Sequence, residues 1–192
     1  MDNTVGSFTK IQIALILGSL LGDGTLRKQS PGRNPLLEVN HSIHSKEYVD
    51  WKYEILKNLV STPPKARKGN GSRIAYRFTT RSLKKLNYLY ERFYRNKRKI
   101  LPDFIKLTPM LLAVWFMDDG SKSRNSLYFN TQQFDLNDQR KLIHWFALQW
   151  NIKATLNKDK YYFRIRINTE GSKKLKEVMR PFIHTSFLYK LR

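Results

Sequence analysis

The sequence contains no cysteine. This absence excludes a disulfide framework and a thiolate nucleophile, so any metal must be bound through oxygen or histidine. It also favours an intracellular protein. Long hydrophobic runs are missing as well, since no segment approaches the roughly 20 apolar residues of a transmembrane helix. Residues 1–6 lack the charged and apolar regions of a signal peptide, so secretion is not expected.

Acidic residues are also scarce. The chain has 15 Asp and Glu against 36 Lys and Arg, which gives a formal charge of +21 and a pI near 10.2. Nucleic acid is therefore the expected partner. A membrane surface is the competing partner, but no basic amphipathic helix is long enough to anchor the chain, so no membrane is expected. With 192 residues, 41% of them hydrophobic, the chain can bury a core as one domain or two small ones.

The most unusual stretch is residues 112–120, Leu-Ala-Val-Trp-Phe-Met-Asp-Asp-Gly, where an apolar run leads into two carboxylates and a glycine. A looser copy, residues 16–24, ends in Asp23 and Gly24. Glycine commonly follows a helix, so Asp23 and Asp119 are predicted at helix C-termini. The helix dipole disfavours a carboxylate there unless a cation is bound. A single Asp-Gly pair is usually a turn, but duplication favours two metal-binding helix ends.

The pattern of apolar residues predicts an α+β protein with antiparallel strands. Strands are expected at residues 37–42, 73–78, 127–132, 153–156 and 162–168, and helices at residues 8–21, 46–59, 82–94, from 137 and from 172.

The order of these elements repeats. Asn40 precedes Lys99 by 59 positions, and Asn130 precedes Lys190 by 60. An internal repeat of about 95 residues indicates a pseudo-twofold molecule like a fused dimer. We expect one half at residues 1–105 and the other at residues 106–192.

A fused dimer with basic strand faces suits duplex DNA, because a twisted antiparallel ribbon fits the major groove. The minor groove is only about 6 Å wide, so two adjacent helix ends could serve both strands across it. Double-strand cleavage is the resulting hypothesis. By symmetry Asp23 and Asp119 are the paired metal ligands, and the backbone carbonyls of Gly22 and Asp118 could complete the coordination. Aspartate oxygens suit magnesium.

Residues 16–24 and 112–120 resemble the two motif copies of single-chain LAGLIDADG homing endonucleases. Residues 107–120 and 130–132 are similar to the subfamily of the yeast mitochondrial omega-intron endonuclease. The resemblance implies that Asp23 and Asp119 bind magnesium, which Mn²⁺ or Ca²⁺ could replace in binding. It gives active-site roles to Lys99, before Ile-Leu-Pro, and to Lys190, within Tyr-Lys-Leu; a solvated charge run is the alternative for each.

The same resemblance implies two αββαββα-like halves, with the motif helices packed at the pseudo-twofold and the antiparallel sheets forming a DNA-binding saddle. It also implies a long target site and a staggered cut with 3′ overhangs. DNA-contacting residues are expected on the basic loops and the polar strand faces. They are Arg27, Lys28, Arg33, Asn40, His41, Arg73, Arg77, Lys122, Arg124, Asn130, Gln132, Arg164, Arg166 and Asn168.

Two other functions fit the same scaffold. One is an intron RNA maturase, which would bind intron RNA and need not cut DNA, and the other is a DNA-binding regulator without chemistry. Both acids and both lysines favour the endonuclease. We expect a monomer in a mitochondrion or chloroplast if the gene is organellar, and otherwise in the cytoplasm of a prokaryote.

Overall fold

A computed structural model describes residues 7–69 and 71–192 of the chain. Two compact units adjoin in the sequence between Tyr90 and Glu91, and they are called unit 1 and unit 2 below. The division lies earlier than the expected one after residue 105, because the linking segment bonds to unit 2. The Leu101 amide, for example, donates to Asp138 Oδ2 at 2.9 Å. Residues 1–6, on which the expectation about secretion rests, lie outside the described residues.

Unit 1 begins with the first motif helix, α1 (Lys10–Leu21). Thr9 caps it, since the Gln12 amide donates to Thr9 Oγ1 at 3.1 Å and the Thr9 amide donates to Gln12 Oε1 at 3.2 Å. This reciprocal pair satisfies two amides that would otherwise lack partners, so the helix starts two residues later than the pattern predicted. It ends at Leu21, as predicted, and Asp23 lies just beyond it.

The sheet of unit 1 is antiparallel with strand order β1-β2-β4-β3. Its strands are β1 (Thr25–Arg27), β2 (Leu36–Ser42), β3 (Lys65–Lys68) and β4 (Ile74–Thr79). The alternation of residues 73–78 predicts one apolar face, and Tyr76 and Phe78 on that face are indeed buried, whereas Ile74 on the same face is 46% exposed. Strand β3 was not predicted. Its four residues are all exposed, so it is a strand only through pairing with β4 at the sheet edge.

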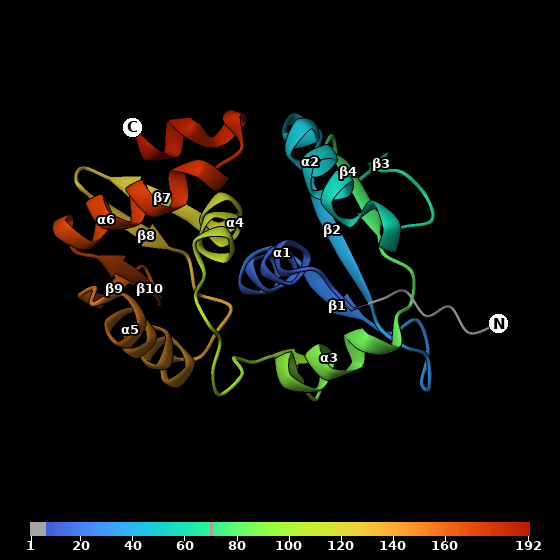
Figure 1. Cartoon of the computed structure of the whole chain (residues 1–192), viewed down its shortest axis with the longest axis horizontal. Coiled ribbons are helices and arrows are strands. Elements are labelled where there is room, and N and C mark those ends of the chain that lie inside the picture. Colours follow the sequence, from blue (N-terminus) through green and yellow to red (C-terminus); the bar gives the residue numbers. More distant parts are fainter. Residues whose placement is uncertain (1–6, 70) are drawn as a thin grey trace. The chain divides into compact units, whose positions relative to one another are not determined.

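Helix α2 (Lys46–Leu56) packs against β2 and β4, and Figure 1 shows it beside these strands. It continues into the 3₁₀ turn η2 (Lys57–Leu59). The helix predicted at residues 82–94 is shorter than expected. It consists of the 3₁₀ turn η3 (Lys84–Leu86) and α3 (Asn87–Phe93), because Tyr94 pairs with Lys99 in the hairpin of β5 (Tyr94–Arg95) and β6 (Arg98–Lys99).

Unit 2 is built around the second motif helix, α4 (Pro109–Asp119). Thr108 caps it, and its residues from Met110 to Met117 are all buried. The antiparallel sheet has strand order β7-β8-β10-β9. Its strands are β7 (Gly120–Ser123), β8 (Ser126–Phe129), β9 (Ala154–Asp159) and β10 (Tyr162–Ile167).

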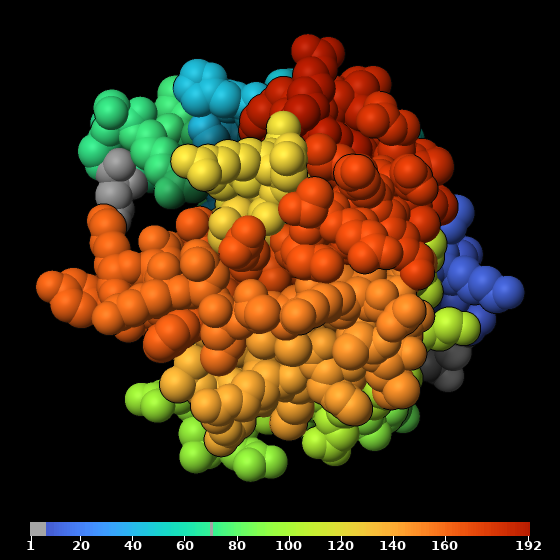
Figure 2. All heavy atoms as spheres, turned by 90° about the vertical axis from the view of Figure 1, so that its left-hand side faces the viewer, coloured from blue at the N-terminus to red at the C-terminus, as the bar shows by residue number. Residues whose placement is uncertain are grey.

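Two helices and two 3₁₀ segments also belong to unit 2: α5 (Leu136–Trp150), α6 (Thr169–Met179), η4 (Arg180–Phe182) and η5 (Thr185–Leu191). Helix α5 packs on β9 and β10 and α6 on β8 (Figure 1). The turn between β9 and β10 projects from unit 2 in deeper orange in Figure 2, and Tyr161 there is 93% exposed. In the described part of the chain, no helix is both long and apolar enough to cross a membrane.

The two units share one plan. In each, a motif helix is followed by two strands, a covering helix and two further strands, and the strand orders β1-β2-β4-β3 and β7-β8-β10-β9 correspond. The covering helices start at matching places, since their N-caps Ser45 and Asp135 follow Asn40 and Asn130 by five residues each. The structure thus confirms the predicted α+β class and the internal repeat.

Glycines allow the chain to turn tightly after each motif helix. A Cβ on Gly24 would lie 2.7 Å from the Ser19 Cβ and 2.8 Å from the Ser19 carbonyl oxygen, and a Cβ on Gly120 would overlap Phe116. Neither Gly24 nor Gly120 has a left-handed backbone, since among the described glycines a positive φ occurs at Gly32 and Gly71. Close approach, and not a left-handed backbone, therefore requires glycine at Gly24 and Gly120.

We expect Gly120→Ala to lower the free energy of unfolding by about 1–3 kcal/mol, because the added methyl group must displace Phe116 or the helix end. Urea denaturation measures this change. Ser123→Ala, at the exposed far end of β7, is the matched control and should shift stability by less than about 0.5 kcal/mol. Equal unfolding midpoints for Gly120→Ala and the wild type would contradict the account of this turn.

Candidate functional site

The second motif places Asp119 at the last position of α4, where it is partly exposed. The side chain of Gln133 links it to a lysine. Gln133 Nε2 lies 3.4 Å from Asp119 Oδ2, and Gln133 Oε1 accepts a hydrogen bond from Lys99 Nζ at 3.0 Å. Lys99 was expected in the first half, but it lies in unit 2 and reaches the carboxylate of that unit through Gln133.

Sequence reasoning missed Gln133 and favoured its neighbour Gln132. Both follow β8, and only the turn of the chain decides which side chain reaches Asp119. Gln132 instead donates to Asp159 Oδ2 at 3.2 Å. A run of polar residues from Asn130 to Gln133 was the available signal, but it could not separate the two glutamines.

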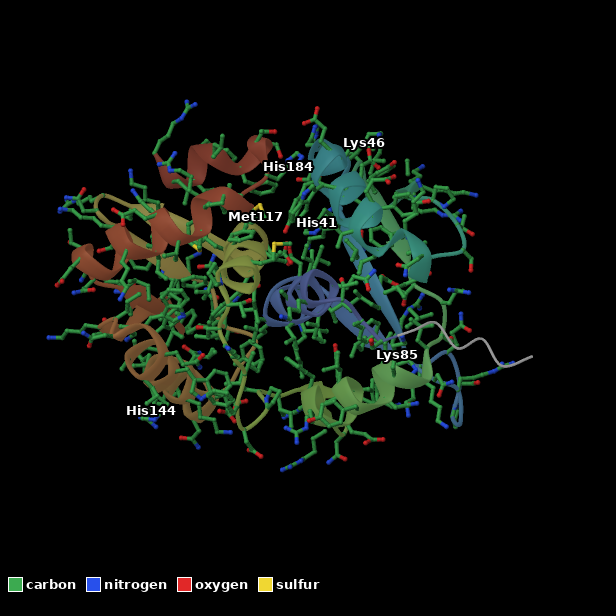
Figure 3. All side chains as sticks on the ribbon, viewed as in Figure 1. His41, Lys46, Lys85, Met117, His144 and His184 are labelled. Carbon is green, nitrogen blue, oxygen red and sulfur yellow. The ribbon has the colours of Figure 1, made fainter. Side chains whose placement is uncertain are left out.

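Lys190 lies at the same helix end as Asp119. Its Nζ donates to the Met117 carbonyl oxygen at 2.8 Å, and it lies 3.5 Å from the Phe116 carbonyl oxygen. A cation is favourable there, because the last carbonyls of a helix carry its negative dipole end. The segment that carries Lys190 is also held near Met117, since the His184 amide donates to Met117 Sδ at 3.2 Å (Figure 3).

A cluster of cations lies near the second motif. The pKa of Lys176 is lowered from its ordinary value, first by burial and then by the positive charges of Lys122 and Arg180. Lys122 also donates to the Arg192 carbonyl oxygen. Lys122 was among the predicted DNA contacts, whereas Lys176 and Arg180 were not. An anion bound here would relieve the mutual repulsion, as a phosphate would.

The first motif places Asp23 just beyond α1, with its side chain 48% exposed. His41 Nδ1 lies 3.5 Å from Asp23 Oδ2. The side chain of His41 thus faces Asp23, and its contact with DNA stays a prediction. Its side chain is only 9% exposed and packs against Tyr48, with the ring centres 5.3 Å apart, so it acts beside Asp23 and not on the sheet surface.

Two arginines of the unit 1 sheet lie beside one carboxylate. Arg27 Nε is 3.0 Å from Glu38 Oε2, and Arg77 Nη1 is 3.7 Å from Glu38 Oε1. Asn40 is exposed on the same strand as Glu38. Lys28 and Arg33 are exposed in the segment between β1 and β2, where Lys28 Nζ lies 4.9 Å from the centre of the Tyr90 ring.

Arginines also line the unit 2 sheet. The Arg164 guanidinium lies over the Tyr128 ring at 4.5 Å, and Arg166 Nε donates to Ser126 Oγ at 3.2 Å. Arg124 is exposed in the tight turn between β7 and β8, with φ of 51°. The Asn130 amide donates to the Asp119 carbonyl oxygen at 2.9 Å, so this residue lies beside the motif.

Two residues predicted on strand faces lie outside the strands, and their contacts with DNA stay predictions. Asn168 caps α6, since its Oδ1 accepts from the Gly171 amide at 2.9 Å and β10 already ends at Ile167. The Asn168 side chain, which the alternating pattern placed on a strand face, therefore caps a helix. Arg73 precedes β4 and lies in the turn before it, where its carbonyl oxygen accepts from the Gly69 amide.

The donor atoms at the two helix ends fit a hydrated divalent cation. No group of three or more His, Cys, Asp or Glu side chains that could hold a metal occurs among residues 7–69 and 71–192. The end of α1 offers Asp23 next to the carbonyl of Gly22, and the end of α4 offers Asp119 next to the carbonyl of Asp118, whose own carboxylate is also partly exposed. Magnesium keeps several of its water ligands and needs only one or two carboxylates from the protein. An open site with a few protein oxygens therefore suits magnesium.

Residues 13–175 match the model of the LAGLIDADG DNA endonuclease family. The chain belongs to this family. The match runs through both motif helices and both sheets, which confirms the resemblance found in the sequence. The element order described above, α-β-β-α-β-β-α in each half with antiparallel sheets, is the one that the resemblance implied.

Named relatives include both maturases and endonucleases. Cytochrome b mRNA maturase bI2 of Saccharomyces cerevisiae is 29% identical over 209 residues, covering 100% of this chain and 49% of the relative. The chain thus spans about half the length of that protein. DNA endonuclease I-ChuI of Chlamydomonas applanata is 30% identical over 209 residues, covering 96% of each chain.

A solved structure is similar over nearly the whole chain. It is the homing endonuclease I-WcaI bound to its DNA recognition sequence, with 26% identity and a TM-score of 0.89, covering 97% of this chain and 88% of that one. The likeness extends to both units of the present LAGLIDADG chain.

The ion pairs of Glu38 yield a test of the basic sheet. We expect Glu38→Gln to tighten binding to duplex DNA about two- to fivefold, because Glu38 competes with DNA phosphates for Arg27 and Arg77. An ion pair near the surface is worth about 0.2–1 kcal/mol. Fluorescence anisotropy measures the affinity. Glu54→Gln removes the same charge from an exposed pair with Lys57 on α2 and should have a smaller effect. Equal changes for both variants would show a general charge effect only.

Proposed function

We propose that this chain is a site-specific, metal-dependent endonuclease that hydrolyses one phosphodiester on each strand of duplex DNA. The observation that carries the proposal is the matched pair of helix ends. Each buried motif helix leads directly to a carboxylate at the same place in a repeated unit, Asp23 or Asp119, whereas Asp118 has no acidic counterpart because Gly22 precedes Asp23. Two equivalent carboxylates are what two antiparallel scissile strands require.

Asp23 and Asp119 would hold a divalent cation through their carboxylate oxygens, together with the carbonyls of Gly22 and Asp118. A bound divalent cation stabilises the charge that develops on the attacking and leaving oxygens of the phosphodiester. Magnesium fits these oxygen ligands, and Mn²⁺ or Ca²⁺ can replace it in binding.

The lysines act next to the carboxylates. Lys190 places its ammonium at the C-terminal end of α4, two residues from Asp119, where it can stabilise the extra charge on the phosphate. Lys99 lies within hydrogen-bond distance of Gln133, which contacts Asp119. Gln133 thereby keeps the carboxylate oriented and the lysine close to it. The same lysine can also take up contact with solvent or phosphate, because it is partly exposed.

The sheets bind the duplex. Their arginines and polar side chains, among them Arg27, Arg77, Asn40, Arg164 and Arg166, provide phosphate contacts and base contacts in the major groove. The two cuts across the minor groove leave 3′ overhangs. The similarity to I-WcaI, described with its DNA recognition sequence, supports this mode of binding. One chain carries both carboxylates, so a monomer suffices.

An intron RNA maturase is the second candidate, and the yeast relative bI2 favours it. A splicing cofactor would use the same basic surface but would not need the paired carboxylates. A DNA-binding protein without chemistry would not need them either. Retention of both Asp23 and Asp119, each with a nearby cation or hydrogen-bond donor, supports cleavage.

Asp23→Asn and Asp119→Asn should each lower the rate of double-strand cleavage by about 100-fold or more, because an amide cannot replace the anionic metal ligand. DNA binding should persist. The substrate is a duplex that the wild-type protein selects from a randomised pool in Ca²⁺, and gel electrophoresis after addition of Mg²⁺ gives the rate. The charge-matched control is Asp103→Asn, at an exposed loop position. Cleavage at the wild-type rate by either motif variant would sink the proposal.

A second experiment separates the endonuclease from the maturase. The same protein preparation is given the selected duplex with Mg²⁺ in one arm and the precursor RNA of its own intron in the other. We expect cutting of the duplex, since the catalytic carboxylates are present. Stimulation of splicing without any nicking of DNA would instead support the maturase.

A further inference from the structure

Unit 1 contains a fully buried lysine that the proposed catalytic residues do not include. Lys52 lies on α2 with a relative exposure of 0%. Its Nζ donates to Ser19 Oγ at 3.1 Å, lies 3.4 Å from His41 Nε2 and stands 4.6 Å from the centre of the Tyr48 ring. His41, marked in Figure 3, in turn lies 3.5 Å from Asp23. The four polar groups therefore form a chain that runs from Ser19 on α1 to the carboxylate of the first motif.

The chemistry of this chain fixes its direction. A lysine ammonium has only donor groups, so His41 Nε2 must accept from it. The proton of the neutral imidazole then resides on Nδ1, which is the atom that faces Asp23 Oδ2. Lys52 thus selects the tautomer of His41 that can donate to Asp23. Such an outer partner orients a metal-binding carboxylate and holds its lone pairs in place.

Unit 2 has the same arrangement, made from different residues. Lys99 Nζ donates to Gln133 Oε1, and Gln133 Nε2 faces Asp119 Oδ2. In both units a lysine donates to a side chain that can accept and donate at once, and that side chain contacts the motif carboxylate. The two lysines differ in exposure, because Lys99 is partly exposed whereas Lys52 is buried.

The fold itself does not require a lysine at this place. Leu142 is the seventh residue of α5, as Lys52 is of α2, and Trp115 precedes Asp119 by four residues, as Ser19 precedes Asp23. Leu142 and Trp115 are both 0% exposed. Unit 2 thus fills the equivalent place with apolar side chains. A buried ammonium is costly compared with such packing, so a role of Lys52 beyond stability is indicated.

We propose that Lys52 and His41 are positioning residues for Asp23, equivalent in role to Lys99 and Gln133 at Asp119. This inference rests on the proposed function, since Asp23 is taken as a metal ligand. Lys52 orients His41, and His41 orients the carboxylate. Loss of Lys52 therefore weakens cation binding at the first motif and slows one of the two strand cuts, so that a singly nicked duplex accumulates.

The test uses four variants of the full chain. Lys52→Met removes the donor and fills its volume, and His41→Ala removes the relay. His41→Gln supplies an amide that can accept from Lys52 and donate to Asp23, as Gln133 does in unit 2. Lys46→Met is the control, because it removes the same charge from the exposed start of α2 (Figure 3). Urea denaturation first establishes that each variant is folded under the assay conditions.

Three quantities are measured. Imidazole ¹⁵N spectra of the DNA-free protein at a pH where histidine is neutral report the His41 tautomer. Electron paramagnetic resonance gives the Mn²⁺ affinity of the complex with the selected duplex. Strand-specific labels give the two cutting rates. We expect Lys52→Met to lose the Nδ1-protonated signature, to weaken Mn²⁺ binding about tenfold and to slow one strand about tenfold. His41→Ala should match it, His41→Gln should stay within about threefold of the wild type, and Lys46→Met should not change.

An unchanged tautomer in Lys52→Met, or unchanged Mn²⁺ affinity and unchanged cutting of both strands, would overturn the inference. Equal damage from His41→Gln and His41→Ala would also overturn it, because a relay must tolerate a substitute that keeps both hydrogen-bonding functions. If the wild type cuts neither strand, the proposed function fails, while the tautomer and the Mn²⁺ affinities still decide the relay.

Discussion

The tight turn of the chain after each motif helix is the constraint on which the rest of the structure depends. Gly24 and Gly120 lie so close to Ser19 and Phe116 that no side chain fits there. The buried helix therefore passes into the first strand of its sheet within a few residues, and the carboxylate just before the glycine is carried to the surface. The same turn of the backbone keeps the apolar helix buried and brings the acid to the surface. The acid and the glycine therefore occur together in both copies.

Around this shared turn the two units have diverged. In unit 2 the helix is covered by aromatic rings, with the centres of Trp115 and Phe129 4.2 Å apart. In unit 1 the residue that matches Trp115 is Ser19, and Ser19 accepts a hydrogen bond from the buried Lys52, which also contacts His41. The chemistry at the carboxylates has changed less than the packing behind them. Both acids are contacted by a side chain that a lysine holds in turn, so a function common to both halves explains the pattern better than the needs of either core.

The sequence predicted those features that depend on local pattern. Asp23 and Asp119 were evident because a carboxylate is disfavoured at the C-terminus of a helix. The repeat was evident from the equal spacing of matching residues in the two halves. Features that depend on tertiary contact were not predictable. Strand β3 has no apolar alternation and exists through pairing with β4, and Asn168 continues the pattern of β10 but caps a helix. The burial of Lys52 was equally hidden, because a lysine on an amphipathic helix is ordinarily solvated.

The central claim is that Asp23 and Asp119 are the cation ligands of a DNA-cleaving site. Crystals of the complex with the selected duplex, grown with Mn²⁺ and measured for anomalous scattering, test it most directly. The account predicts anomalous peaks within about 2.0–2.3 Å of carboxylate oxygens of both residues. The absence of a peak at both motif carboxylates would contradict it. Peaks would then lie elsewhere, for example in the hollow of unit 2 whose lining includes Glu91, Asp103, Asp135 and Asp138.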